Sequence, residues 1–214
     1  MKNFLLNLLD WIYKKKCYFC RSSRESVKMC TKCYEKMHFY SQNANRIISG
    51  VNVYTCGFYK SEMQKLIRGL KYHRQSDLAF YQAKFMWEYW QMLNVDKKFI
   101  VIPVPMHKNR KNKRKYNHME LVALEFCKLS GFDYNFNLIE RIKDTKSQYN
   151  LKREQRMQNL ANAFRVNCKE ELQKPLLIID DICTTGSTFE SMIQELNKNG
   201  IYNITCLATA TVDF

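Results

Sequence analysis

Residues 176–188 read LLIIDDICTTGST, and this stretch decides the fold. Its first four residues are aliphatic without alternation, which is typical of a strand covered on both faces in a parallel sheet. Two adjacent acids, Asp180 and Asp181, follow, and a loop around Gly186 leads into a helical pattern at 187–200. Because ligands of open α/β sheets bind at the carboxyl ends of the strands, the two acids lie where a ligand is expected.

The loop that follows the acids has the composition of a phosphate cradle. Backbone N–H groups and the dipole of the next helix attract an anion, and Gly186 lets the backbone approach a phosphate closely. Four hydroxyl side chains add donors, namely Thr184, Thr185, Ser187 and Thr188. Carboxylates would repel a neighbouring phosphate unless they bind sugar hydroxyls or face Mg²⁺, and a ribose 5-phosphate moiety meets both demands. The alternative is an ordinary strand–helix turn with a capping aspartate.

Strand and helix patterns alternate outward from this stretch. Strand patterns occupy 50–60 (a hairpin is the alternative), 99–105, 134–143, 175–182 and 202–212. Apolar residues at helical spacing mark 61–73, capped by Ser61, 77–93, capped by Asp77, and 117–131, and a polar helical turn is expected at 151–164. This alternation predicts an α/β fold in which a mostly parallel sheet is flanked by helices.

The N-terminal segment carries a different pattern. Residues 1–16 place apolar side chains on one helical stripe and predict a short amphipathic helix. Two CxxC pairs follow, formed by Cys17, Cys20, Cys30 and Cys33. Four such thiolates complete a tetrahedral shell around a structural Zn²⁺, whereas unligated thiols or a redox pair are the alternatives. We therefore expect a zinc-knuckle module at 1–49 and the α/β domain at 50–214.

The chain is strongly basic, with a formal net charge of +15. Six cations fall within eight residues, at Lys108, Arg110, Lys111, Lys113, Arg114 and Lys115. Such a cluster favours a polyanionic partner, above all nucleic acid bound through its phosphates. His107 and His118 flank the cluster and are further candidates for phosphate contact. The alternatives are a merely solvated basic loop and a drift toward lysine without functional meaning.

The cysteines and the N-terminus also bear on location. Five of the nine cysteines are scattered through apolar segments, a pattern that favours a reducing compartment and hence the cytoplasm. The apolar core of residues 1–16 is too short to span a bilayer, so no stable membrane insertion is expected. Docking of this helix on its own domain is the favoured use, and binding at a membrane surface is the alternative.

Residues 176–188 resemble the phosphoribosyl-pyrophosphate (PRPP) signature of type I phosphoribosyltransferases, which has four apolar residues, two acids and a T-T-G-[ST]-T loop. The chain as a whole resembles the ComF family of competence-associated proteins. The stretch PVPMHKNRKNKRKYNHME is similar to that family's P-V-P-x-H…R-x-R-G-F-N-Q, although KYNH (115–118) replaces its G-F-N-Q. A second family stretch is matched by Arg141, Thr145, Gln148, Leu151, Arg156, Asn159, Ala163 and Phe164.

The resemblance implies a type I phosphoribosyltransferase-like fold with PRPP and Mg²⁺ as ligands. Asp180 and Asp181 would hold the ribose hydroxyls as the candidate catalytic residues, and the loop at 184–188 would hold the 5-phosphate. The ligand's own oxygens would hold Mg²⁺, with the acids in support. The basic cluster at 108–115 would close over the pyrophosphate. Thr184 stands where purine enzymes carry an aspartate, which disfavours purine salvage because a hydroxyl is a poor general base.

Two functions are compatible with this resemblance. The first is the handling of incoming single-stranded DNA during natural transformation, with a competence helicase or DNA-processing proteins as possible partners. The second is phosphoribosyl transfer to an unidentified small-molecule acceptor unrelated to DNA uptake. The net charge favours the first function, whereas a binding fold alone does not establish turnover.

Overall fold

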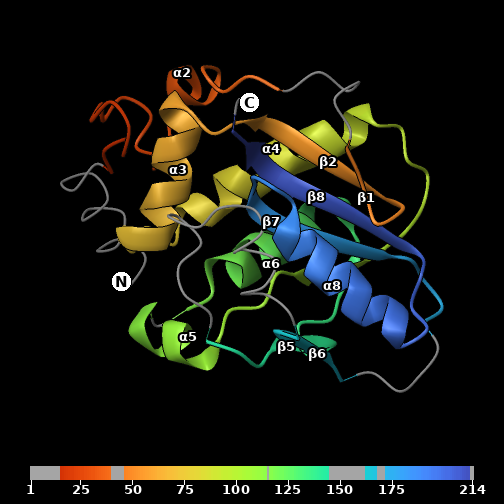
Figure 1. Ribbon diagram of the computed structural model, residues 1–214. Coiled ribbons are helices and arrows are strands. Elements are labelled where there is room, and N and C mark those ends of the chain that lie inside the picture. Colours follow the sequence, from red (N-terminus) through yellow and green to blue (C-terminus); the bar gives the residue numbers. More distant parts are fainter. Residues whose placement is uncertain (1–14, 40–45, 115, 145–161, 168–171, 213–214) are drawn as a thin grey trace, which may run out of the picture.

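The computed structural model describes residues 15–39, 46–114, 116–144, 162–167 and 172–212, which form a mixed α/β fold around a central sheet (Figure 1). The sheet has six strands in the order β1-β2-β8-β7-β3-β4. Their bounds are β1 (Arg46–Ile48), β2 (Val51–Phe58), β8 (Ile204–Thr211), β7 (Leu176–Cys183), β3 (Ile100–Pro103) and β4 (Asp133–Tyr134). Only β1 pairs antiparallel, so β2, β8, β7 and β3 end at one edge of the sheet.

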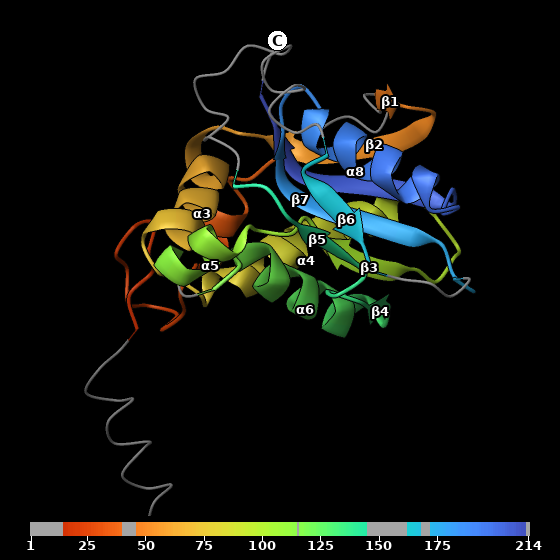
Figure 2. The same ribbon diagram turned by 60° about the horizontal axis from the view of Figure 1, so that its bottom comes forward.

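Helices cover both faces of this sheet (Figure 2). One face carries α3 (Ser61–Tyr72), α4 (Leu78–Met92) and α6 (His118–Ser130). The other face carries α8 (Ser187–Lys198) and a separate antiparallel pair of strands, β5 (Ile139–Arg141) and β6 (Phe164–Val166). β7 is apolar on both faces because its residues alternate between the two cores. Leu177 and Ile179 face α4, and Leu176 and Ile178 face α8.

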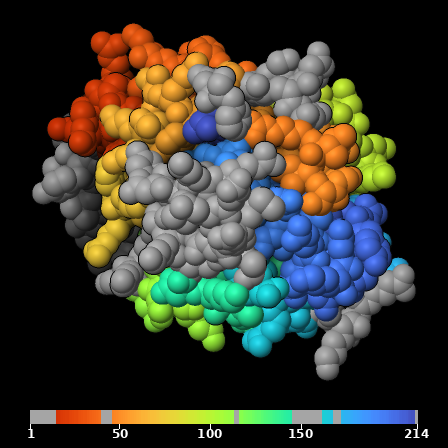
Figure 3. Space-filling view, in the orientation of Figure 1, coloured from red at the N-terminus to blue at the C-terminus, as the bar shows by residue number. Residues whose placement is uncertain are grey.

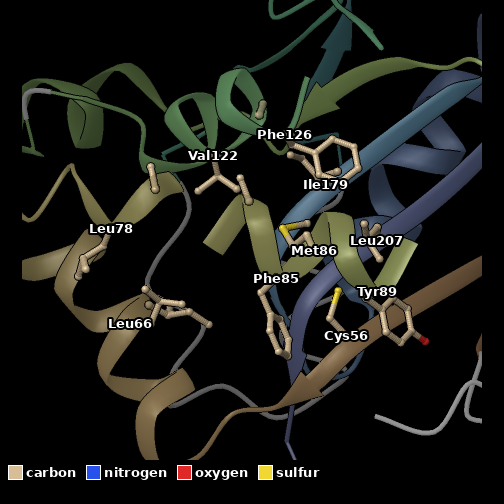
Figure 4. Packing of buried hydrophobic residues seen from close by; sticks show 14 of the residues in the cluster. Cys56, Leu66, Leu78, Phe85, Met86, Tyr89, Val122, Phe126, Ile179 and Leu207 are labelled. Atoms are coloured by element: carbon tan, nitrogen blue, oxygen red, sulfur yellow. The ribbon is translucent and has the colours of Figure 1, made fainter. Parts of the chain in front are cut away.

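The larger core lies on the α4 face (Figure 4). Phe85, Met86 and Tyr89 of α4 are fully buried there, against Leu207 of β8. The aromatic residues of the segment 77–93 therefore belong mainly to the core, which follows from their helical spacing in an apolar helix.

Residues 15–39 share this larger core. Met29 and Met37 belong to the same buried cluster as Leu66 of α3, and α2 (Thr31–Tyr34) lies among them. The sheet itself begins with β1 at residue 46, before the boundary that we expected between 49 and 50. The division into two domains stays a prediction, and the expected helix at 1–16 lies almost wholly outside the described residues.

The helix predictions for α4, α6 and α8 are confirmed, with differences at some ends and connections. α6 begins after Asn117, whose side chain accepts a hydrogen bond from the Met119 N–H, and ends at Gly131 in the left-handed region. Ser61 is the first residue of α3, and the cap position is Lys60. None of the helices within the described ranges is long and apolar enough to cross a membrane.

Three segments between these helices differ from the prediction. The predicted strand at 134–143 divides into β4, which extends the main sheet, and β5, which leaves it to pair with β6. Phe164 starts β6 rather than ending a helical turn, and most of the segment 151–164 lies outside the described residues. The basic cluster, expected as a loop, forms the short helix α5 (Lys108–Arg114).

Candidate functional site

The two acids lie near the carboxyl end of β7 and face opposite sides of the sheet. Asp181 is 5% exposed and faces α3 and α6. Its Oδ2 atom lies 2.7 Å from Nζ of Lys71 and accepts a hydrogen bond from Nε2 of His118. Asp180 is half-buried, and its Oδ1 atom accepts a hydrogen bond of 2.8 Å from the N–H of Asp181. Three elements, α3, α6 and β7, therefore meet at a single carboxylate oxygen.

The environment separates the acidities of these two neighbours. Burial alone would raise the pKa of Asp181, but the positive charge of Lys71 and the hydrogen bond from His118 hold that pKa well below its usual range. Burial and the charge of Asp181 raise the pKa of Asp180 to about 7, although Lys71 partly offsets them. Asp181 is consequently a fixed anion near neutral pH, whereas Asp180 is close to its titration point.

The loop after the acids turns sharply into α8. Gly186 has a φ of +81° and occupies the cap position of that helix. The Thr185 hydroxyl donates to Oγ of Ser187 over 3.1 Å, so the hydroxyl groups of the loop converge. β1 holds the loop from outside, because Nη1 of Arg46 donates to the Thr184 carbonyl over 2.7 Å. Thr188 is the second residue of α8. The structure thus brings the two acids and the hydroxyl loop together at one edge of the sheet.

The basic cluster on α5 is partly neutralised within the protein. Nζ of Lys111 lies 3.0 Å from Glu120, and Nε of Arg110 lies 3.8 Å from Asp144. Lys108 is exposed. The side chains of Lys113, Arg114 and Lys115 lie outside the described residues. The free charge that the described part of α5 offers to a polyanion is accordingly smaller than its composition suggests.

Sequence reasoning missed Lys71 at this edge and did not place His118 and Arg141 beside the acid pair. Lys71 and His118 are bound to Asp181, and His118 is a buried partner of that acid rather than a flank of the basic cluster. Burial, with Arg110 adding to it, lowers the pKa of Arg141 to about 10, while the charge of Asp180 opposes this shift. Arg141 therefore lies within electrostatic range of both α5 and the acid pair. The sequence held a signal for Lys71, because it occupies the apolar stripe of α3 four residues after the buried Ile67.

The four N-terminal cysteines form a second site. The sulfur atoms of Cys17, Cys20, Cys30 and Cys33 all lie within 4.8 Å of one another, so the group could hold a metal ion such as zinc. Burial raises the pKa of the Cys17 thiol, but backbone N–H groups of Cys20, Cys30 and Phe19 outweigh it and lower that pKa to about 6. This donor set fits a closed structural site, because four thiolates leave no open coordination position.

The fold and its two sites define a mixed α/β protein with a mostly parallel sheet and a four-cysteine group near its N-terminus. Solved structures that resemble it include the allosteric regulatory enzyme of purine biosynthesis (TM-score 0.45, 12% identity, covering 67% of this chain and 30% of that one). Another is adenine phosphoribosyltransferase from Thermoanaerobacter pseudethanolicus (TM-score 0.37, 11% identity, covering 65% of this chain and 83% of that one). No family model matches the sequence.

Curated relatives cover most of the chain. Competence protein F of Haemophilus influenzae is 26% identical over 200 residues, which are 88% of this chain and 86% of that protein. DNA utilization protein YhgH of Salmonella typhimurium is 25% identical over 193 residues, which are 86% of this chain and 85% of that protein. YhgH of Escherichia coli K12 is 26% identical over 152 residues (68% and 66%). The chain is thus a homologue of Competence protein F and of YhgH, which confirms the resemblance stated from its motifs.

Proposed function

We propose that this protein binds PRPP with Mg²⁺ at the carboxyl edge of the sheet and handles incoming single-stranded DNA in the cytoplasm during natural transformation. The observation that carries the ligand site is the convergence of Asp180, the hydroxyl loop 184–188 and the start of α8. The printed names of the relatives, a competence protein and a DNA utilization protein, support the DNA role. The net charge of +15 supports a polyanionic partner.

The geometry divides the work between the two acids. Asp180 is the acid with an oxygen available to sugar hydroxyls, whereas Asp181 is engaged by Lys71 and His118. The loop 184–188 would receive the 5-phosphate through its N–H and hydroxyl groups. Mg²⁺, when bound, would supply charge neutralisation at the pyrophosphate. Arg141 and α5 would add positive charge beside the same group. Zn²⁺ would be held by the four cysteines as a structural ion.

Phosphoribosyl transfer to a small-molecule acceptor is the second candidate. Asp180 favours it, because a carboxyl group whose pKa is about 7 can exchange a proton near neutral pH. Such an enzyme would release pyrophosphate when an acceptor is added to the PRPP complex. If PRPP binds but no member of a panel of nucleobases and small amines causes pyrophosphate release, the protein binds PRPP without transferring its phosphoribosyl group to these acceptors.

The ligand site is tested by calorimetric titration of PRPP with Mg²⁺ into the zinc-loaded protein. We expect Asp180→Asn to abolish measurable binding, because it removes the charge that holds the sugar hydroxyls. Asp133→Asn is the matched control, since Asp133 is an exposed acid on β4 at the opposite edge. Binding that survives in Asp180→Asn would contradict the assignment of this acid.

The DNA role is tested separately, with a labelled oligothymidylate and fluorescence anisotropy at several salt concentrations. Alanine substitutions at the six cations of 108–115 should weaken binding and flatten its salt dependence, because fewer counterions are released. Asp180→Asn should leave DNA binding intact. A salt slope that the cluster variant does not change would contradict a role for these cations.

A further inference from the structure

Most of the excess positive charge lies outside α5. Residues 15–39 and 60–74 contain twelve lysine and arginine residues against three glutamates, a net charge of +9 out of +15 for the whole chain. Two cations of this set, Lys36 and Lys71, lie within ion-pair distance of an acid, namely Glu62 and Asp181. Most of the field that would attract a polyanion therefore originates at the N-terminal module and α3.

Aromatic rings lie beside the cations of α3, one at the end of the helix and two from residues 18 and 19. Lys65, Arg68 and Tyr72 follow one another at i, i+3 and i+7, so they form one stripe on the exposed side of the helix. The Tyr72 side chain is 60% exposed, and the Arg68 guanidinium lies 5.8 Å from its ring centroid. The Lys65 ammonium lies 5.4 Å and 5.5 Å from the ring centroids of Tyr18 and Phe19.

Specific contacts join the N-terminal module to this stripe. The Tyr18 hydroxyl lies 2.5 Å from Nδ1 of His73, and Lys65 donates to the Phe19 carbonyl over 2.8 Å. Gly69 makes the close approach possible, because a Cβ there would lie 3.2 Å from the Tyr18 ring. Figure 3 shows the surfaces of the N-terminal module and α3 side by side. The rings and cations thus lie on one preformed surface.

We propose that this surface, made of Lys65, Arg68, Tyr72, Tyr18 and Phe19, is the binding track for single-stranded nucleic acid. The inference rests on the proposed DNA role and adds a second surface, on α3 and residues 18 and 19, to the cations of α5. The cations take the phosphates, and the exposed ring of Tyr72 offers a face on which an unpaired base stacks, with the half-buried rings of Tyr18 and Phe19 beside it. A duplex hides its base faces, so this surface discriminates in favour of a single strand.

The position of α3 also relates the track to the ligand site. Lys71 lies between Arg68 and Tyr72 in sequence but points inward, to the carboxylate of Asp181. A nucleic-acid strand bound on the outer side of α3 would therefore run beside the carboxyl edge of the sheet, where Asp180 lies.

The experiment measures anisotropy of a labelled 15-nucleotide oligothymidylate and of a duplex of equal length, over a range of salt concentrations. Tyr72→Ala should weaken binding of the single strand about five- to tenfold at every salt concentration, because one stacking contact is lost. Arg68→Ala should weaken it and reduce the salt slope by about 0.7, the value for one phosphate contact on a single strand. Tyr202→Ala is the matched control, because Tyr202 is 70% exposed before β8 at the opposite edge.

The outcomes separate this inference from the proposed function. A wild-type protein that binds no oligonucleotide would overturn both the DNA role and the track. Wild-type binding that Tyr72→Ala and Arg68→Ala leave as strong as Tyr202→Ala does would overturn the track alone. Equal affinity for duplex and single strand would also overturn it, since charge would then suffice. Loss of binding to anionic phosphatidylglycerol vesicles, but not to the oligonucleotide, in Tyr72→Ala would assign the surface to lipid instead.

Discussion

Replacement of Asp181 by asparagine removes the charge that holds Lys71 and His118 at the carboxyl edge of the sheet. The side chains of Lys71 and Asp181 are 18% and 7% exposed, so water replaces little of the lost interaction. At their separation of 2.7 Å, two unit charges in an effective dielectric of about 20 attract by about 6 kcal/mol. Desolvation offsets part of this attraction, and breaking one partner of a buried pair costs about 3–5 kcal/mol. We therefore expect Asp181→Asn to lower the free energy of unfolding by about 3 kcal/mol or more.

Urea unfolding of the zinc-loaded protein, followed by circular dichroism, measures this loss. The double variant Lys71→Met with Asp181→Leu should cost less than the sum of its two single variants by more than about 1 kcal/mol. Each single variant leaves the partner's charge buried, whereas the double variant removes both charges. The exposed pair of Lys174 and Asp133 is the matched control, with exposures of 46% and 61%. Breaking that pair should change the stability by less than about 1 kcal/mol. Additivity of the Lys71 and Asp181 variants within about 0.5 kcal/mol would refute the reasoning.

Three further outcomes are expected. Gly186→Ala should destabilise the protein by about 0.5–1.5 kcal/mol more than Gly200→Ala, the cost of moving a side chain off its rotamer. Both glycines have positive φ, but of the two only Gly186 would bring a Cβ onto another atom, Cδ1 of Ile48 at 2.2 Å, which must move aside. Equal losses in thermal unfolding would contradict the overlap. The raised pKa of Asp180 means that its contribution to stability is present below about pH 4 and is lost as pH rises through about 7. Asp180→Asn should therefore gain stability over wild type between pH 5 and 8, and a constant difference across that range would contradict the shift. Chelation of zinc should release one ion per chain and lower the melting temperature, and an unchanged melting temperature after full release would argue against a structural ion.

Much of the fold was predictable because it depends on local patterns. The apolar run of β7, the spacing of α3 and α4, and the Asn117 and Gly131 signals at the ends of α6 each act over a few residues. The division of the segment 134–143 into β4 and β5 was not predictable in this way, because the two strands pair with different partners that are distant in sequence.

The site was predictable only in part, for a related reason. The acid pair, the loop and the four cysteines follow one another closely in the sequence, and their spacing carries the chemistry. Asp181 is 63 positions from His118 and 110 positions from Lys71, so the network around Asp181 forms only through the packing of three elements.

The place of β8 in the sheet has a consequence for biosynthesis. This strand, the last one described along the chain, lies between β2 and β7 and pairs with both along its length. A ribosome makes β2, β7 and every described helix before it reaches residue 204. Until β8 emerges, the part of the sheet formed by β1 and β2 and the part that contains β7, with its two acids, have no strand to join them. The nascent chain therefore exposes two unpaired strand edges until synthesis of β8 is complete, and we expect it to need protection by chaperones during that interval.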